Sequence, residues 1–388
     1  MTSLARTDGS TAFADVRAAR FATRAMFLIC GTVTASWAPQ VPLAKARLGL
    51  DDGVLGLTLL GLGAGAMVAM PLAGFLASRF SSRLITAIGG LVLCLSLPLV
   101  ILAPDAPLLG LALFLFGAAT GSMDVAMNVQ AAAVEGRGGR PVMSSFHGMF
   151  SVGGLVGAGG ASLMLGLGLS PLVTALVVSG LMLALLLAQA GSMLPPDRRA
   201  AAAGARFTLP RGIVLVLGLL TFVLFQAEGA VLDWSAVFLH DSRGQDPAVA
   251  GLGYAMFAVA MAVMRLAGDG ITSRFGGETV VRLGSGLAAA GFLLAVLAPW
   301  PEAGLAGFAL VGVGAANVVP VLFSAAGRVP GLPPGLAISS IATLGYLGIL
   351  VGPAAIGFLA DHLGLPTALG IVAALLVATA ASARAVRV

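Results

Sequence analysis

Two acidic residues lie deep inside long apolar stretches of this chain of 388 residues, away from the ends of the stretches. Asp124 lies in the stretch 107–132, and Glu228 lies in the stretch 212–239. An ionisable side chain inside a membrane is costly unless it is paired or wetted, so natural sequences rarely keep one there without a use. Asp124 is therefore a candidate for proton coupling or substrate binding, with a structural ion pair as the alternative. Glu228 is a candidate for a second titrating group or a substrate ligand.

Amide and aromatic side chains accompany these acids. Asn128 follows Asp124 by one helical turn, so both side chains project from one face of a helix. Asn128 could bind a substrate hydroxyl or make a hydrogen bond between helices. Other aromatic rings and amides in apolar stretches could bind a polar ligand, or could simply be packing residues. These cavity candidates are Trp37, Gln40, Gln226, Asn317 and Tyr346.

One arginine also lies deep inside an apolar stretch, away from its ends. Arg265 lies in the stretch 248–272 and needs a counter-charge or water there. Asp269 is one helical turn further on, so a structural pair between them is one interpretation. The functional interpretation is that Arg265 binds an anionic group or latches two halves of the molecule together, with Asp269 beside it.

The composition indicates that lipid is the main solvent of these stretches. Hydrophobic residues make up 59% of the chain and charged residues 10%, and the mean hydropathy is +1.03. Soluble domains carry about 25% charged residues. The stretches are long enough for helices that cross a hydrocarbon core of about 30 Å. The sequence therefore predicts an all-α membrane protein with twelve transmembrane helices. The predicted spans are 22–44, 53–77, 83–103, 107–132, 142–166, 171–194, 212–239, 248–272, 279–299, 303–327, 335–361 and 366–385.

The basic residues predict the orientation of these spans. Of the 21 Lys and Arg residues, seventeen fall in segments on the side of the N-terminus, and Lys45, Arg47 and Arg243 fall on the other side. Because cytoplasmic loops are rich in Lys and Arg, both termini are predicted to be cytoplasmic. The predicted divisions are a cytoplasmic arm at 1–21, an N-terminal six-helix bundle at 22–194, a cytoplasmic linker at 195–211 and a C-terminal six-helix bundle at 212–388.

The two predicted bundles share a repeat of 195 positions. Six residues between 144 and 157 recur between 339 and 352 at that offset. Ser78-Arg79-Phe80 recurs at the same offset as Ser273-Arg274-Phe275. Parallel repeats of six helices, related by an axis along the membrane normal, are typical of transporters. The bundles are therefore pseudo-symmetric, whereas neither deep acid has an acidic counterpart in the other copy.

These features resemble the major facilitator superfamily over essentially the whole chain. The family pattern G-x-x-x-D-R-x-G-R-R/K after the second helix is matched at Gly74, Arg79 and Arg83, while its aspartate and second glycine are absent. The second copy keeps Arg274 and Gly276. The resemblance implies a gating role for the three arginines, together with two six-helix bundles in the major facilitator fold.

Two strings resemble a narrower group. Gly121-Ser-Met-Asp124-Val-Ala-Met-Asn128 is similar to the G-x-x-E-x-x-x-N pattern of fucose permease-like proteins, and the string that begins at Asn317 is similar to their F-P-T-I-F-S. With the segments around Glu228 and His147, the chain resembles the rhizopine-type (MosC-like) bacterial permeases. The resemblance implies that the regions of His147 and Arg265 meet at a gate, with polar packing as the alternative for the histidine. The acid that the group carries in its first helix is absent here.

Together these patterns predict a secondary active transporter of the bacterial inner membrane. We expect it to move a small polar solute, such as a sugar, polyol or inositol-like compound, by alternating access with proton coupling. Proton-coupled efflux of a drug or metabolite is the alternative, and a non-transporting membrane sensor is a further one. No HExxH, GxSxG, CxxC or phosphate-loop string occurs, so we expect no enzyme activity, cofactor or metal. The expected partners of this monomer are the bilayer, the solute and protons, without nucleic acid.

Overall fold

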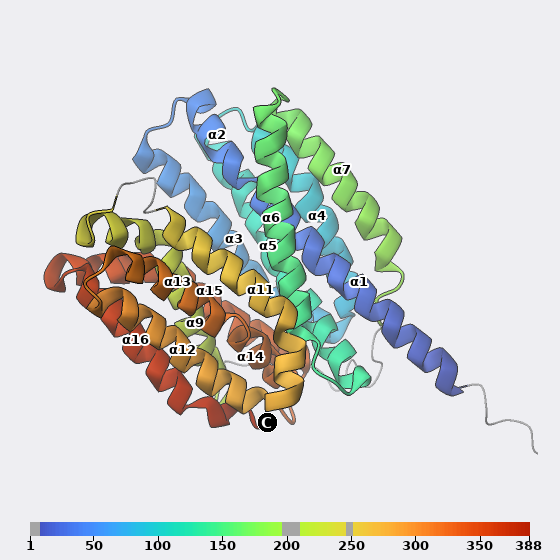
Figure 1. The fold of residues 1–388 in the computed structure, drawn as a ribbon. Coiled ribbons are helices and arrows are strands. Elements are labelled where there is room, and N and C mark those ends of the chain that lie inside the picture. Colours follow the sequence, from blue (N-terminus) through green and yellow to red (C-terminus); the bar gives the residue numbers. More distant parts are fainter. Residues whose placement is uncertain (1–7, 196–209, 246–250) are drawn as a thin grey trace, which may run out of the picture. The chain divides into compact units, whose positions relative to one another are not determined.

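The protein is helical throughout the part of the chain that the computed structural model describes, which is residues 8–195, 210–245 and 251–388. Figure 1 shows the helices along the chain, and no β-strand lies in these ranges. Most of the predicted linker 195–211, and the first seven residues of the predicted arm 1–21, lie outside the described residues.

Long helices and two short ones make up the N-terminal part of the chain. Four of the long helices begin at a side chain that accepts a hydrogen bond from a backbone N–H three residues later, namely Asp51, Ser81, Asp105 and Ser170. Such caps satisfy N–H groups that a helix leaves unpaired at its start. The elements are α1 (Asp8–Ser36), η1 (Ala38–Gln40), α2 (Val41–Leu48), α3 (Asp52–Arg79), α4 (Ser82–Leu102), α5 (Ala106–Gly138), α6 (Met143–Gly166) and α7 (Pro171–Ala190).

The C-terminal part contains a second series of helices. Arg243 donates hydrogen bonds to the carbonyls of Ala295 and Val296 at 2.8 and 2.6 Å, and so caps the end of one helix from another segment. The elements are α9 (Ile213–Val237), η2 (Phe238–Ser242), α11 (Leu252–Phe275), α12 (Gly277–Leu297), α13 (Pro301–Ala315), α14 (Val318–Ala326), α15 (Pro334–Leu363), α16 (Leu365–Ala381) and η3 (Ala383–Val386).

These helices form two compact units. The first unit holds the helices from α1 to α7, without Pro141–Gly148 but with Pro333–Ser339. The second unit holds the helices from α9 to α16, and Pro141–Gly148 packs with it. Helices α6 and α15 therefore each contribute residues to both units.

Ten helical segments in the described part of the chain are long and apolar enough to cross a membrane, with α13 and α14 counted together as Glu302–Ala326, and α16 is a shorter apolar helix. The ten match the predicted spans from the second to the eleventh. Large apolar side chains lie on their outer surfaces, and Leu57 and Leu187 are each 72% exposed. Exposed apolar surface of this extent suits contact with lipid rather than water. The all-helical prediction is confirmed.

The first predicted span, 22–44, is not one continuous helix. Residues 8–21, predicted as a polar arm, are the first turns of α1, because this alanine-rich segment favours helix. The helix stops at Ser36 rather than at residue 44. Pro39 follows, and its missing N–H and fixed backbone angle end a regular helix. The chain then turns through η1 into the separate helix α2.

Glycines let neighbouring helices touch backbone to backbone, and they do so in the same way in both units. A Cβ atom on Gly117 of α5 would collide with the carbonyl oxygen of Leu62 on α3. A Cβ atom on Gly312 of α13 would collide with the carbonyl oxygen of Phe257 on α11. Both residues of the second pair lie 195 positions after those of the first. The sequence repeat is therefore also a repeat of helix packing.

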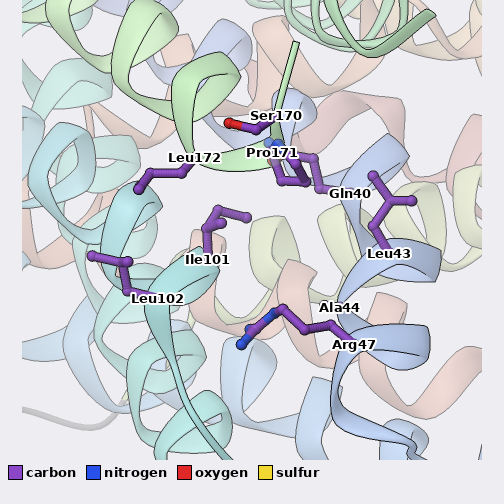
Figure 2. A pocket seen from close by; sticks show the side chains of 9 residues that line it. All are labelled: Gln40, Leu43, Ala44, Arg47, Ile101, Leu102, Ser170, Pro171 and Leu172. Atoms are coloured by element: carbon purple, nitrogen blue, oxygen red, sulfur yellow. The ribbon is translucent and has the colours of Figure 1, made fainter. Parts of the chain in front are cut away.

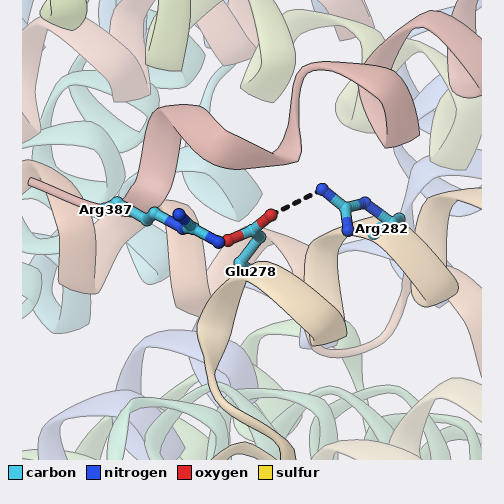
Figure 3. A network of polar contacts seen from close by, with 3 residues as sticks. All are labelled: Glu278, Arg282 and Arg387. Carbon is cyan, nitrogen blue, oxygen red and sulfur yellow. Dashed lines mark hydrogen bonds and ion pairs between the residues drawn. The ribbon is translucent and has the colours of Figure 1, made fainter.

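A polar network holds the C-terminal end of the chain to α12 (Figure 3). Glu278, in the first turn of α12, accepts a hydrogen bond from Arg282 at 2.5 Å and another from Arg387. The carboxylate at the helix N-terminus also has a favourable interaction with the helix dipole. This cluster lies within the second unit.

Candidate functional site

A charged pair joins α9 and α11 in the second unit. The Arg265 Nη2 atom lies 3.4 Å from the Glu228 Oε1 atom. The side chain of Arg265 is 10% exposed and that of Glu228 is 20% exposed, so both charges are largely withdrawn from solvent. Removing either partner would strand the other charge, which is the costly arrangement. Reasoning from the sequence offered Asp269 as the partner of Arg265 and did not predict this pair.

Arg265 also bonds to a backbone carbonyl that a proline leaves open. Helices α13 and α14 are separated at residues 316–317, so the predicted span 303–327 is broken. A helical carbonyl accepts a hydrogen bond from the N–H four residues later, and Pro320, four residues after Ala316, has no N–H. The Arg265 Nε atom donates to the Ala316 carbonyl at 3.2 Å instead.

Asn317 ties the same break to α11. Its Nδ2 atom donates to the carbonyl of Met264 at 3.0 Å. A Cβ atom on Gly268 would collide with the Asn317 side chain and lie 2.5 Å from the Ser144 Cβ atom, so the packing there requires glycine. Two hydrogen bonds thus join the broken helix to α11. Arg265 of α11 donates to the break between α13 and α14, and Asn317 in that break donates to α11.

Asp269 caps the first turn of α6. The Ser145 backbone N–H donates to the Asp269 Oδ1 atom at 2.9 Å. N–H groups in the first turn of a helix lack helical partners, and a carboxylate is favourable there. His147, two residues further along, packs edge-on against Phe323, with ring centroids 5.6 Å apart. The first turn of α6 is also close to Arg265. A Cβ atom on Gly148, the residue after His147, would lie 3.5 Å from the Arg265 carbonyl carbon.

The contact in the first unit that corresponds to Asp269 and the first turn of α6 carries no charge. Gly74 of α3 precedes Asp269 by 195 positions, and Ser144 precedes Ser339 by the same number. A Cβ atom on Gly74 would collide with the Ser339 side chain. Close contact between small residues in the first unit is thus replaced by a carboxylate cap in the second.

Asp124 and Asn128 lie on one face of α5 in the first unit, as their spacing predicts. The Asn128 Nδ2 atom donates to the Asp124 carbonyl at 2.9 Å and lies 3.3 Å from the Asp124 Oδ1 atom. Asn128 is fully buried and Asp124 is partly buried. Within the described ranges Asp124 makes no ion pair, so its partner there is an amide.

The predicted cavity residues lie in two places. Trp37 and Gln40, both buried, lie beyond the end of α1, and the Gln40 Nε2 atom donates to the Ser36 carbonyl at 3.0 Å. In the second unit, the buried Gln226 lies on α9, and Tyr346 of α15 packs edge-on against the Phe225 ring at 5.8 Å between centroids. An amide and an aromatic ring of α9 and an aromatic ring of α15 therefore lie on two helices that pack together, since a Cβ atom on Gly348 of α15 would collide with the Phe222 carbonyl oxygen of α9.

The predicted gating arginines lie at helix ends. The guanidinium of Arg79 lies 5.9 Å from the ring centroid of Phe80, and that of Arg274 lies 5.4 Å from the ring centroid of Phe275. The repeated sequence thus gives a repeated stacking of arginine on phenylalanine. Arg79 and Arg274 are exposed, and Arg83 is partly buried. Their role in gating stays a prediction.

Two backbone groups of the site, the Ala316 carbonyl and the Ser145 N–H, were not predicted from the sequence. The Ala316 carbonyl could have been found from Pro320, since a proline inside a predicted helix opens the carbonyl four residues earlier. The Ser145 N–H carries no such signal, because its partner comes from a distant helix. Across the described residues, no group of three or more His, Cys, Asp or Glu side chains could hold a metal ion.

Comparison with known proteins decides the family. An uncharacterised MFS-type transporter of Yersinia pestis is 51% identical over 369 residues, which cover 94% of each chain. The chain belongs to the major facilitator superfamily. The model of that superfamily matches residues 217–387. The membrane protein MosC of Rhizobium meliloti is 33% identical over 348 residues, which cover 88% of this chain and 84% of MosC.

The solved structures show that the fold is shared as well. FucP, the fucose:proton symporter of E. coli, has a crystal structure in the outward conformation that matches with a TM-score of 0.78. The match has 19% sequence identity and covers 94% of this chain and 97% of FucP. This member of the superfamily is therefore a multi-pass membrane transporter, and the predicted resemblance to MosC-like and fucose permease-like proteins is confirmed.

Proposed function

We propose that this transporter moves a small polar solute, such as a sugar, polyol or inositol-like compound, across the bacterial inner membrane by alternating access coupled to protons. The observation that carries the proposal is the pair of Glu228 and Arg265, held against the broken helix at Ala316. The shared fold with a fucose:proton symporter supports it.

The pair offers a physical route from a proton to a change in helix contacts. When Glu228 is ionised, it attracts the Arg265 guanidinium and joins α9 to α11. A proton on Glu228 removes that attraction, whereas the bond from Arg265 to the Ala316 carbonyl remains. A guanidinium has several N–H donors, so a hydroxylated solute can accept a hydrogen bond from it while donating one to a carboxyl group.

Asp124 supplies a second carboxyl for proton coupling. Its amide neighbour Asn128 and the amides of Gln226 and Asn317 are the proposed groups that bind solute hydroxyls, with the rings of Trp37 and Tyr346 packing on apolar faces of the solute. Amides and rings of this kind fix the orientation of small polar ligands in transport and binding sites.

The proposal includes the topology of the chain. Twelve spans in two six-helix bundles, with both termini in the cytoplasm, place seventeen of the 21 basic residues on the cytoplasmic side. The bundles are 22–194 and 212–388, joined by the linker 195–211. We propose that the monomer makes and breaks the contact between Asp269 and the first turn of α6, near His147, during its cycle.

Uptake into proteoliposomes tests the proposal. Thermal unfolding of the purified protein against a panel of sugars and polyols first selects a solute, and uptake of that labelled solute is then measured with and without a pH gradient. The matched variants are Glu228→Gln and Asp361→Asn, since Asp361 is an exposed acid without an ion pair among the described residues.

We expect gradient-driven accumulation in the wild type and in Asp361→Asn, and a loss of about tenfold or more in Glu228→Gln, which corresponds to about 1.4 kcal/mol. Accumulation that ignores the pH gradient in the wild type would contradict proton coupling. Net export under the same gradient would favour the efflux alternative.

A further inference from the structure

We propose that a cavity in the first unit, formed by α2, α4 and α7, binds the phosphate headgroup of an anionic membrane phospholipid. The cavity has a volume of about 280 Å³, and Figure 2 shows Arg47 and Ser170 among the side chains around it, with leucines of all three helices. Of the residues predicted to bind a polar ligand, Gln40 lines this cavity, and neither Glu228 nor Arg265 does.

The cavity lies at the depth of the membrane surface. Leu102, in its wall, is the last residue of one candidate span, and Pro171 is the first residue of another. The ends of membrane spans lie where the hydrocarbon core gives way to headgroups. Lipid headgroups therefore surround the protein at the level of this cavity, whereas a soluble ligand would have to come from the water phase.

Arg47 supplies the charge that recognises the headgroup. It is exposed on α2, and it makes no hydrogen bond or ion pair within the described ranges of the chain. A guanidinium binds phosphate oxygens through two parallel hydrogen bonds, and basic residues at the surface attract anionic lipids. The neighbouring charge of Lys45 adds to the positive potential of the same short helix.

The walls of the cavity favour a lipid over a free solute. The walls at Leu43, Leu102 and Leu172 are apolar and suit the first methylene groups of an acyl chain. Gln40 also lines the cavity, and its Oε1 atom has no donor among the described residues. A headgroup with a free hydroxyl, such as that of phosphatidylglycerol, can supply one.

Lipid titration of the full-length protein in detergent tests this site. The thermal midpoint is measured against phosphatidylglycerol, phosphatidylcholine with the same acyl chains, and inorganic phosphate alone. Arg47→Gln removes the charge, and Leu43→Trp fills the cavity. Arg140→Gln is the matched control, because Arg140 is another exposed arginine without a hydrogen bond or ion pair among the described residues.

We expect phosphatidylglycerol to raise the midpoint more than phosphatidylcholine, with an affinity that Arg47→Gln and Leu43→Trp lower about fivefold or more and Arg140→Gln leaves unchanged. Equal effects of the two lipids on the wild type would overturn the proposal, as would an unchanged affinity in both cavity variants. A full effect of inorganic phosphate alone would show that a free anion, not a lipid, fills the cavity. Because these readouts need no transport, they stand independently of the proposed solute and proton coupling.

Discussion

The two units share their helix packing and differ in the residues that carry charge. Positions 195 residues before Glu228 and Arg265 are Val33 and Met70. Both are fully buried apolar side chains in the first unit. The pair that joins α9 to α11 in the second unit therefore has an apolar counterpart in the first, and the fold does not require a charge at these places.

The helix break differs in the same way. Counterparts of Ala316 and Pro320 in the first unit are Gly121 and Val125, which lie inside the unbroken helix α5. The Met70 Cγ atom lies 3.1 Å from where a Cβ atom on Gly121 would be. In the first unit an apolar methionine side chain therefore packs against the residue that corresponds to Ala316, whose carbonyl accepts a hydrogen bond from Arg265 in the second unit. The proline, the open carbonyl, the arginine and the glutamate thus form one connected addition to a duplicated scaffold.

Arg265→Met places at this position the methionine that the first unit carries. We expect it to have the largest effect of the single substitutions, because Arg265 contacts both Glu228 and the Ala316 carbonyl. It strands the Glu228 charge and leaves the Ala316 carbonyl without its donor. Loss of one partner of a buried pair costs about 3–5 kcal/mol, so we expect a lower thermal midpoint and no measurable transport. Thermal unfolding and proteoliposome uptake check this, with the exposed Arg211→Met as control. A wild-type midpoint in Arg265→Met would show that the pair contributes nothing to the fold.

Asp124→Asn sharpens the comparison from the other unit, where the counterpart position is Val319. An amide keeps the size of the side chain and its hydrogen bond with Asn128 but cannot carry a proton. We expect a normal thermal midpoint, normal exchange of solute across the membrane without a gradient, and gradient-driven accumulation lowered about tenfold. If accumulation also stays normal, Asp124 has no part in coupling.

Matching glycine substitutions test what the units share. Gly117→Ala and Gly312→Ala each force a methyl group against a carbonyl oxygen of the neighbouring helix. Overpacking costs about 1–3 kcal/mol, and we expect similar losses of stability from the two variants because the contacts are equivalent. Denaturation in detergent measures both. Unequal losses beyond about 1 kcal/mol would mean that the repeat in sequence is not a repeat in packing.

Pro320→Val has the smallest expected effect. It gives residue 320 the N–H that its counterpart Val125 has, so the Ala316 carbonyl can accept a helical hydrogen bond in place of the one from Arg265. We expect unchanged or slightly higher stability and uptake lowered about threefold, or about 0.7 kcal/mol in the transport barrier. A rise in uptake would show that the break itself is not needed.

The sequence predicted the scaffold better than the site. Long apolar stretches predicted most helices between residues 53 and 361 within a few residues, because lipid imposes length and hydrophobicity on every span, but they did not predict the break between α13 and α14. The early end of α1 was missed, although Pro39 marks it. The pairing of Arg265 with Glu228 was missed for a different reason. Glu228 is 37 positions away on another helix, and only tertiary packing brings the two together.

The most direct test of the account is the double variant Glu228→Val with Arg265→Met, which gives the second unit the two apolar residues of the first. Replacing both partners of a buried ion pair by apolar groups is often neutral or stabilising. We predict a thermal midpoint well above that of Arg265→Met alone, lowered from the wild type only by the open Ala316 carbonyl, which costs about 1–3 kcal/mol, and no gradient-driven uptake. A double variant that is as unstable as Arg265→Met, or one that still accumulates solute against a gradient, would contradict the claim that this charged pair serves transport rather than the fold.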